Sequence, residues 1–163
     1  MKMSLLDVIF NRASVRRYTP EPVSEEALNN ILEAGRRAPS AMNAQPWHFI
    51  VVTEQKLRDQ LSKRRWTGFV KDAPLVVIGC GKKHDHLSTV DVAIALQNMV
   101  LAAEAQGLGS CWIGDFDQKE LKRMFRIPDN LTVIAMVAFG HPAEKPASRN
   151  KKSLEEIVHH NRF

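Results

Sequence analysis

Residues 38–49, APSAMNAQPWHF, carry closely spaced side chains that could bind a ligand. Ser40, Asn43 and Gln45 lie between two prolines, and each proline fixes its own φ and restricts the residue before it. Hydroxyl and amide groups both donate and accept hydrogen bonds, so this set suits a flat heteroaromatic ring or a polyol chain. An ordinary helix-to-strand connection, in which Asn43 and Gln45 cap neighbouring backbone, is an equally open interpretation.

A second candidate is the arginine-rich segment Arg12-Ala13-Ser14-Val15-Arg16-Arg17. Three arginines and a hydroxyl within six residues can surround a phosphate dianion with charge-assisted hydrogen bonds. In extended backbone Arg12, Ser14 and Arg16 would share one face, while Val15 and Arg17 would take the other. Without supporting motifs, a basic strand on the surface would be the preferred interpretation.

Hydrophobic periodicity predicts the elements that hold these segments. Helices are expected near residues 5–10, 25–37, 54–63, 89–106, 117–127 and 154 onward, and strands near 49–52, 73–80, 109–114 and 131–139. This order predicts a single α+β domain over residues 1–163, with a mostly antiparallel central sheet flanked by helices. The helix at 89–106 is apolar around most of its circumference, which favours burial in a subunit interface.

Composition limits the classes of protein. The chain has 163 residues, of which 44% are apolar and 25% charged, as in a globular domain. There is no signal-peptide pattern and no apolar run of about 20 residues, so we expect no membrane span and a cytoplasmic location. Cys80 and Cys111 lie in apolar sequence, as free buried thiols do.

The net charge of +5 is compatible with nucleic acid, an anionic membrane surface or anionic small ligands. The densest run, Lys63-Arg64-Arg65, has no nucleic-acid motif around it, and a solvated face is its more typical role. His84 and His86 have no suitably spaced third ligand, so no metal site is predicted. Trp66 and Phe69 could form a mobile aromatic flap over a flat ligand, the edge of a core, or a subunit contact.

Four segments, in this order, resemble the FMN-dependent nitroreductase family. They are Arg12 to Tyr18, the loop Pro39-Ser40-x-x-Asn43-x-Gln45-Pro46-Trp47-x-Phe49, the glycine-punctuated stretch Gly107 to Gly114, and Gly140-His141-Pro142 through Pro146 to Arg149-x-Lys151. Each segment alone is a weak signal, but the ordered set spans nearly the whole chain. The resemblance implies a nitroreductase-like fold, an intertwined homodimer and flavin sites built by both subunits.

The resemblance also assigns roles in holding a tightly bound FMN. Arg12 and Ser14 would contact the phosphate with Arg149 and Lys151, and Arg16 would lie at the N1 and O2 edge of the flavin. Backbone amides at Ile113 and Gly114 would face N5 and O4. The remaining contacts would come from Ala13, Pro39, Ser40, Ala41, Asn43 and Gln45, with Pro39 and Ser40 supplied by the neighbouring subunit.

Two positions depart from the family pattern. Ala13 stands where many members carry a second cation or a histidine, and Lys151 stands where arginine is common. Lysine keeps the charge but loses bidentate geometry, so we expect weaker retention of FMN without its loss.

No Gly-x-Gly-x-x-Gly fingerprint for a nicotinamide nucleotide occurs in the sequence, so the pyridine nucleotide is expected to act as a transient co-substrate. The resemblance implies ping-pong hydride transfer from NAD(P)H through flavin N5 to a nitroaromatic, quinone or similar small-molecule acceptor. No side-chain acid or base is required, because the flavin carries the chemistry. Two alternatives stay open: the same fold in other reductive chemistry, such as dehalogenation or flavin handling, and a basic binding protein without enzymatic activity.

Overall fold

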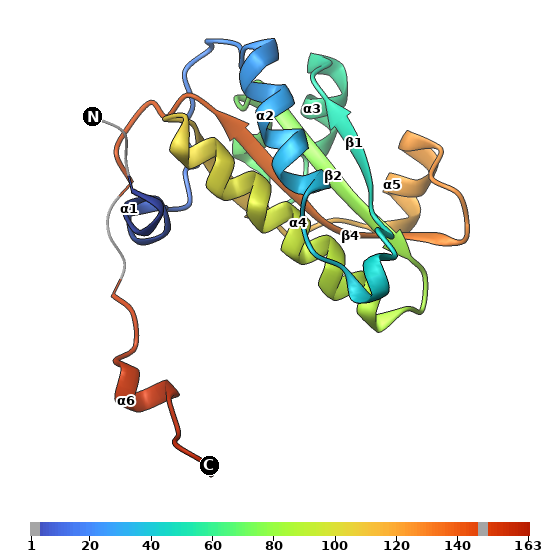
Figure 1. The fold of residues 1–163 in the computed structure, drawn as a ribbon. Helices are drawn as coiled ribbons and strands as arrows, with labels where there is room; N and C mark the ends of the chain where they lie inside the picture. Colours follow the sequence, from blue (N-terminus) through green and yellow to red (C-terminus); the bar gives the residue numbers. More distant parts are fainter. Residues whose placement is uncertain (1–3, 147–149) are drawn as a thin grey trace.

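The computed structural model describes residues 4–146 and 150–163. Its centre is a four-stranded sheet in the order β1-β2-β4-β3, in which every neighbouring pair is antiparallel (Figure 1). The strands are β1 (His48–Val52), β2 (Leu75–Lys82), β3 (Gly109–Ile113) and β4 (Leu131–Gly140). The prediction of an α+β fold with an antiparallel sheet is confirmed.

Helices cover both faces of this sheet. They are α1 (Leu5–Asn11), α2 (Glu25–Arg36), α3 (Gln55–Leu61), α4 (His86–Ala105), α5 (Gln118–Phe125) and α6 (Leu154–Ile157), with short 3-10 turns η1 (Ala41–Asn43) and η2 (Gly68–Lys71). Helices α2 and α4 pack in one core cluster, whereas α3, η2 and α5 contribute to the other. Alternate side chains of β2 enter opposite clusters, Val76 and Ile78 one and Leu75 and Val77 the other. This explains why β2 is apolar without alternation.

Helix α4 begins three residues earlier than the sequence pattern suggests. The Asp85 side chain accepts a hydrogen bond from the backbone N of Ser88 and so caps the helix at His86. Gly107, at φ 78°, follows its end as expected. Among the described residues α4 alone is long and apolar enough to cross a membrane, but its packing against α2, β2 and β4 is that of a core helix.

Two apolar surfaces of the chain face outward. Only Val8 of α1 is buried, and the apolar stripe predicted for this helix leaves Leu5, Leu6, Ile9 and Phe10 accessible. The outer side of α4 likewise exposes Leu87, Val90 and Ile94. Residues 150–163, which include α6, extend away from the sheet in Figure 1 and are exposed throughout. Within the described residues, these surfaces are not covered by other parts of the chain.

Candidate active site

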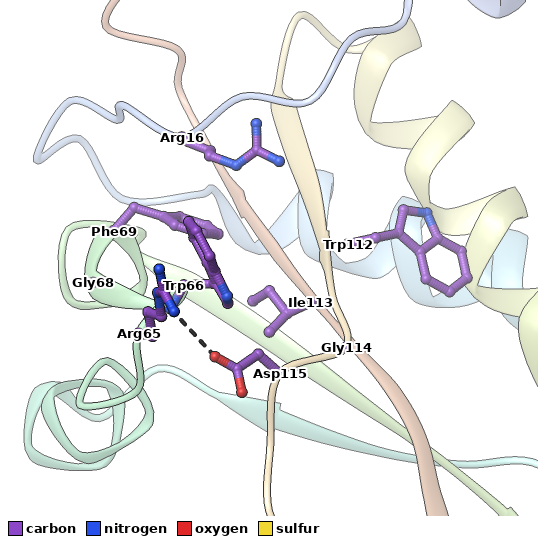
Figure 2. Close-up of a pocket in the computed structure, with 9 residues that line it drawn as sticks. All are labelled: Arg16, Arg65, Trp66, Gly68, Phe69, Trp112, Ile113, Gly114 and Asp115. Carbon is purple, nitrogen blue, oxygen red and sulfur yellow. Dashed lines mark hydrogen bonds between the residues drawn. The ribbon is translucent and has the colours of Figure 1, made fainter.

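A cleft of about 550 Å³ lies between the arginine-rich segment, the end of β3 and the aromatic segment (defined as residues 64–69). It brings together three of the predicted site residues, Arg16, Ile113 and Gly114 (Figure 2). Trp66 and Phe69 line the opposite wall. Sequence positions separated by about a hundred residues therefore meet at one site.

The arginine-rich segment is fixed against β3. The backbone N of Val15 donates to the oxygen of Ser110 at 2.9 Å, and Val15 itself is buried. A Cβ at Gly109 would lie 2.5 Å from Cγ2 of Val15, so this close approach depends on glycine. Because Val15 points inward, Ser14 and Arg16 are exposed on the other side, as alternation predicts.

The buried side chain of Tyr18 holds the arginine-rich segment in place from the core side. Its hydroxyl donates to the backbone oxygen of Val15 at 2.7 Å. Burial raises the pKa of Tyr18 well above its usual range, so the phenol stays protonated and keeps donating. Arg17 does not share an inward face with Val15: it is exposed and pairs with Glu144 at 3.1 Å.

The backbone at Gly114 borders open space. A Cβ built there would meet no atom within 4 Å, and its φ lies outside the left-handed region. A flat ring could therefore approach the main chain closely at this point. The Arg16 guanidinium, this accessible backbone and the aromatic wall together fit a planar heteroaromatic ring with polar edges, as the isoalloxazine of FMN is.

Asp115 joins the aromatic segment to the end of β3. Its Oδ1 accepts from Nε of Arg64 at 2.8 Å. Its Oδ2 accepts from the backbone N of Trp66 at 3.2 Å (Figure 2). The hydrogen bond from Arg64 holds the pKa of Asp115 below its usual value, so the carboxylate stays ionised at neutral pH. Both walls of the cleft are thereby connected by one side chain.

Arg58 of α3 fixes the stretch of chain that follows the aromatic segment. This buried guanidinium donates to the backbone oxygens of Thr53, Lys71 and Ala73 and to the side chain of Gln55. Trp66 lines the cleft and is 68% exposed, whereas Phe69 also packs against the core. Of the three interpretations of these aromatics, a position over the cleft fits Trp66, and Phe69 joins the cleft to the core.

The proline-bracketed loop (residues 38–48) does not line this cleft. The backbone N of Ala41 donates to both oxygens of Asp91, a buried residue in the first half of α4, at 3.2 and 3.3 Å. Within the loop, Oγ of Ser40 accepts from the backbone N of Gln45, and Nε2 of Gln45 donates to the oxygen of Asn43. The capping interpretation thus applies to Gln45.

This loop also carries unusual backbone geometry. Met42, Asn43 and Gln45 all have positive φ, at 51°, 55° and 48°. For residues other than glycine the left-handed backbone conformation is strained, and strained residues are often found at ligand-binding sites. Pro39, Asn43 and Gln45 are exposed, and Ser40 and Ala41 are half-buried.

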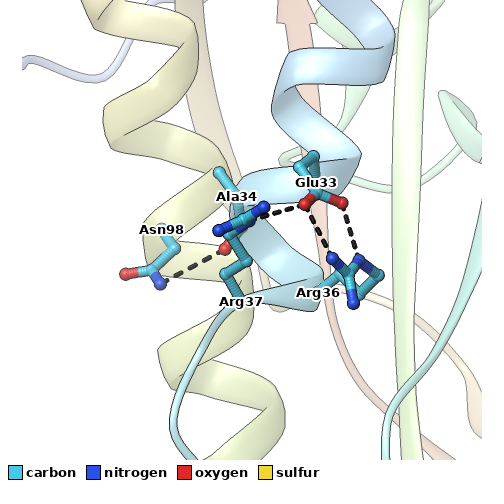
Figure 3. A network of polar contacts seen from close by, with 5 residues as sticks. All are labelled: Glu33, Ala34, Arg36, Arg37 and Asn98. Atoms are coloured by element: carbon cyan, nitrogen blue, oxygen red, sulfur yellow. Dashed lines mark hydrogen bonds and ion pairs between the residues drawn. The ribbon is translucent and has the colours of Figure 1, made fainter.

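A polar network fixes the end of α2, from which the loop departs. Glu33 accepts from Nε and Nη2 of Arg36 and from Nε of Arg37, at 2.6 to 2.7 Å (Figure 3). The hydrogen bonds from Arg36 and then Arg37 lower the pKa of Glu33 to about 2. Nδ2 of Asn98 donates to the oxygen of Ala34 at 3.3 Å and ties α2 to α4.

The loop and the arginine-rich segment lie at opposite ends of α4. The loop is bonded to Asp91, whereas Arg12 is near Glu104, where its charge opposes the rise in pKa of Glu104 that burial causes. Asp91 and Glu104 are thirteen positions apart in the helix, or about 20 Å at 1.5 Å per residue. One chain therefore does not bring its two predicted half-sites together.

The remaining predicted contacts are distributed as follows. Arg12 and Ala13 are half-buried at the end of α1, and Lys151 is exposed on the C-terminal extension. Arg149 lies outside the described residues. Four cleft residues were not predicted as site residues: Arg65, Gly68, Trp112 and Asp115. Arg65 was assigned to a solvated basic run, and nothing in the sequence around Asp115 indicates its contact with a segment 49 positions earlier.

Comparison with known proteins identifies the family of this chain. The profile described as "Nitroreductase family" matches residues 9–73 and 63–141. The chain belongs to the nitroreductase family. A relative from Methanothermobacter thermautotrophicus, named as a candidate NADH dehydrogenase/NAD(P)H nitroreductase, is 35% identical over 158 residues, which cover 91% of this chain and 83% of the relative.

Two further similar proteins are informative. The iodotyrosine deiodinase of Thermotoga neapolitana is 30% identical over the full length of both chains. The crystal structure of an FMN-dependent nitroreductase from Clostridium difficile is 28% identical with a TM-score of 0.87, and the match covers 96% of this chain and 98% of that one. Membership makes this nitroreductase-family chain an NAD(P)H-dependent oxidoreductase that uses flavin, rather than a binding protein without activity.

Proposed function

We propose that this protein is an FMN-dependent oxidoreductase that takes hydride from NAD(P)H and delivers it, in a ping-pong reaction, to nitroaromatic, quinone or similar acceptors. The observation that carries the proposal is the cleft that combines Arg16, the open backbone at Gly114 and an aromatic wall. FMN bound there would supply the hydride transfer at its N5 atom. The chain would supply binding, orientation and charge.

Arg16 would be the cation that stabilises negative charge at the N1 and O2 edge, because its side chain lines the cleft. Backbone amides at Ile113 and Gly114 would orient the ring from the N5 side. Arg12 and Ser14, beside Ala13, would hold the phosphate, completed by Arg149 and Lys151 from the C-terminal extension. FMN retention would depend on this set, in which Ala13 and Lys151 are the weak positions.

We also propose a homodimer with shared flavin sites. In one chain the half-sites lie about 20 Å apart along α4. A twofold axis that sets two α4 helices antiparallel would bring the loop of one subunit to the arginine-rich segment of the other. Pro39, Ser40, Ala41, Asn43 and Gln45 would then come from the partner. The accessible apolar residues of α1 and α4 and the extended C-terminus are the surfaces available for this contact.

Sedimentation of the purified protein tests the dimer. A species of twice the mass of the 18.4 kDa chain is expected, and a monomer with full flavin occupancy would overturn shared sites. We further propose that residues 1–163 act as one FMN-binding domain in the cytoplasm.

The first experiment is an absorbance spectrum from the near-ultraviolet to about 550 nm, recorded before and after anaerobic NADH or NADPH. Oxidised flavin bands that bleach support the reductase assignment. Bands that persist indicate another electron donor, and the absence of flavin even after adding FMN overturns the proposal. Arg16→Ala should lower the flavin midpoint potential, and an unchanged potential with FMN bound would remove the role given to Arg16.

A second candidate function is reductive dehalogenation. It is favoured by the full-length match to an iodotyrosine deiodinase. Iodide release from 3-iodotyrosine by the reduced, FMN-loaded protein would support it. Turnover of a nitroaromatic without iodide release would favour the first assignment.

A further inference from the structure

We propose that Arg65 and Trp66 form a subsite for an anionic substituent on an aromatic electron acceptor. This inference rests on the proposed function, because it concerns the second substrate of the same cleft. It names a class of acceptor, planar aromatics that carry a carboxylate or a similar anion.

The charges that line the cleft leave one cation uncompensated. Arg16, Arg65 and Asp115 are the ionisable residues of its wall. Both oxygens of Asp115 are engaged by Arg64 and by the backbone of Trp66. Arg16 lines the cleft and is the residue proposed above to stabilise the charge of the reduced flavin. Within the described ranges, 4–146 and 150–163, no carboxylate lies within ion-pair distance of Arg65.

Arg65 is also held in a particular position. Its Cζ lies 4.7 Å from the centroid of the Trp66 ring, within the range of a cation–π contact. The backbone of Trp66 is in turn fixed by Asp115 at 3.2 Å. Trp66 is 68% exposed, and the planar guanidinium of Arg65, with its fork of donors, lies over its ring. An aromatic ring could pack against the part of the indole that Arg65 leaves open while its anionic group pairs with Arg65.

The test compares 4-nitrobenzoate with 4-nitrobenzamide, which have similar shapes but differ in charge. Each nitro group takes a hydride, supplied by NAD(P)H, and a proton, and releases water as it becomes a nitroso group. The ratio of the two kcat/KM values should be about five- to tenfold lower in Arg65→Gln than in the wild type, as expected for a partly exposed charge-assisted hydrogen bond. Taking this ratio cancels the intrinsic reactivity of the two compounds.

Two further variants define the cause. Arg65→Lys should restore part of the ratio, because it keeps the charge but loses the planar fork. Lys71→Gln removes a positive charge from η2 at an exposed side chain outside the cleft wall, and it should leave the ratio at the wild-type value. The wild-type preference for the anion should also weaken as ionic strength rises.

A binding measurement supplies a readout that does not depend on turnover. Benzoate and benzamide, which the enzyme cannot reduce, are titrated into the oxidised, FMN-loaded protein, and binding is followed by tryptophan fluorescence. Arg65→Gln should lower the affinity for benzoate and leave the affinity for benzamide nearly unchanged. Equal losses for both compounds would overturn the subsite and leave Arg65 a general part of the wall.

A separate measurement tests whether Arg65 binds the phosphates of the nicotinamide nucleotide and not the acceptor. Flavin reduction by NADH and NADPH, measured in a stopped-flow instrument, should change less in Arg65→Gln than the oxidation step with 4-nitrobenzoate. A change confined to flavin reduction would assign Arg65 to the nucleotide phosphates and overturn the acceptor subsite. If wild-type protein reduces neither nitro compound, the proposed function itself fails, which is a different result.

Discussion

Two glycine-to-alanine substitutions should have opposite effects, because the added methyl groups meet different surroundings. At Gly114 a Cβ would have no neighbour within 4 Å, and φ is compatible with alanine. Loss of backbone freedom in the unfolded chain should make Gly114→Ala neutral or more stable by ~0.4–1 kcal/mol. For a chain of this length that corresponds to a Tm rise of about 1–4 °C.

At Gly109 the same methyl would lie 2.5 Å from Cγ2 and 2.8 Å from Cβ of Val15, where ordinary contact begins at 3.4 Å. Val15 is buried and its branched side chain cannot move aside by a small rotation. Overpacking of this kind costs about 1–3 kcal/mol. Gly109→Ala should therefore lower the Tm of the FMN-free protein by about 2–12 °C.

The effect of Gly114→Ala on FMN affinity should be opposite to its effect on stability. If the flavin ring approaches the backbone at Gly114, a methyl group there should remove the close contact and a hydrogen bond worth about 1.4 kcal/mol, which is a tenfold rise in Kd. The assay is quenching of FMN fluorescence on titration with FMN-free protein, alongside thermal unfolding by circular dichroism. A Gly114→Ala protein that unfolds at or above the wild-type Tm and binds FMN with unchanged Kd would refute the placement of the ring.

Three further substitutions test the parts around the site. Asp115→Asn should loosen the aromatic segment, because it weakens the contacts with Arg64 and Trp66. The KM for the acceptor should then rise several-fold more than kcat falls, and the fluorescence emission of Trp66 should shift to the red. An unchanged KM and emission would show that Asp115 does not position this wall. Glu33→Gln should lose stability relative to the wild type at neutral pH. Because the folded pKa of Glu33, about 2, lies below its unfolded value of about 4.5, that difference in Tm should shrink as pH falls from 4.5 to 2, and a difference independent of pH would contradict the network. Ile94→Glu on the exposed side of α4 should shift sedimentation toward the monomer and reduce FMN occupancy, and a stable dimer would exclude this face from the interface.

Much of the fold was predictable because local signals agree with the tertiary structure. The serine caps before α1, α2 and α6, the glycine after α4 and the apolar runs of β2 and β4 all act within a few residues. The start of α4 was misplaced by three residues, since the helix begins at His86, where the Asp85 side chain caps it, ahead of the apolar run. The apolar residues of α1 predicted a helix but could not show that they remain uncovered in one chain.

The sequence by itself determined the family, the order of the elements and most of the residues proposed to hold FMN, because these depend on residue types at short, fixed spacings. Only the tertiary structure decided which of them meet. It brought Arg16 and Gly114 to one cleft and showed that Asp115 and Arg65 line the same cleft. It also placed the proline-bracketed loop about 20 Å along α4 from the arginine-rich segment. The physical reason is that these relations arise from contacts across many positions of the chain, such as the bond from Trp66 to Asp115, which no local spacing encodes.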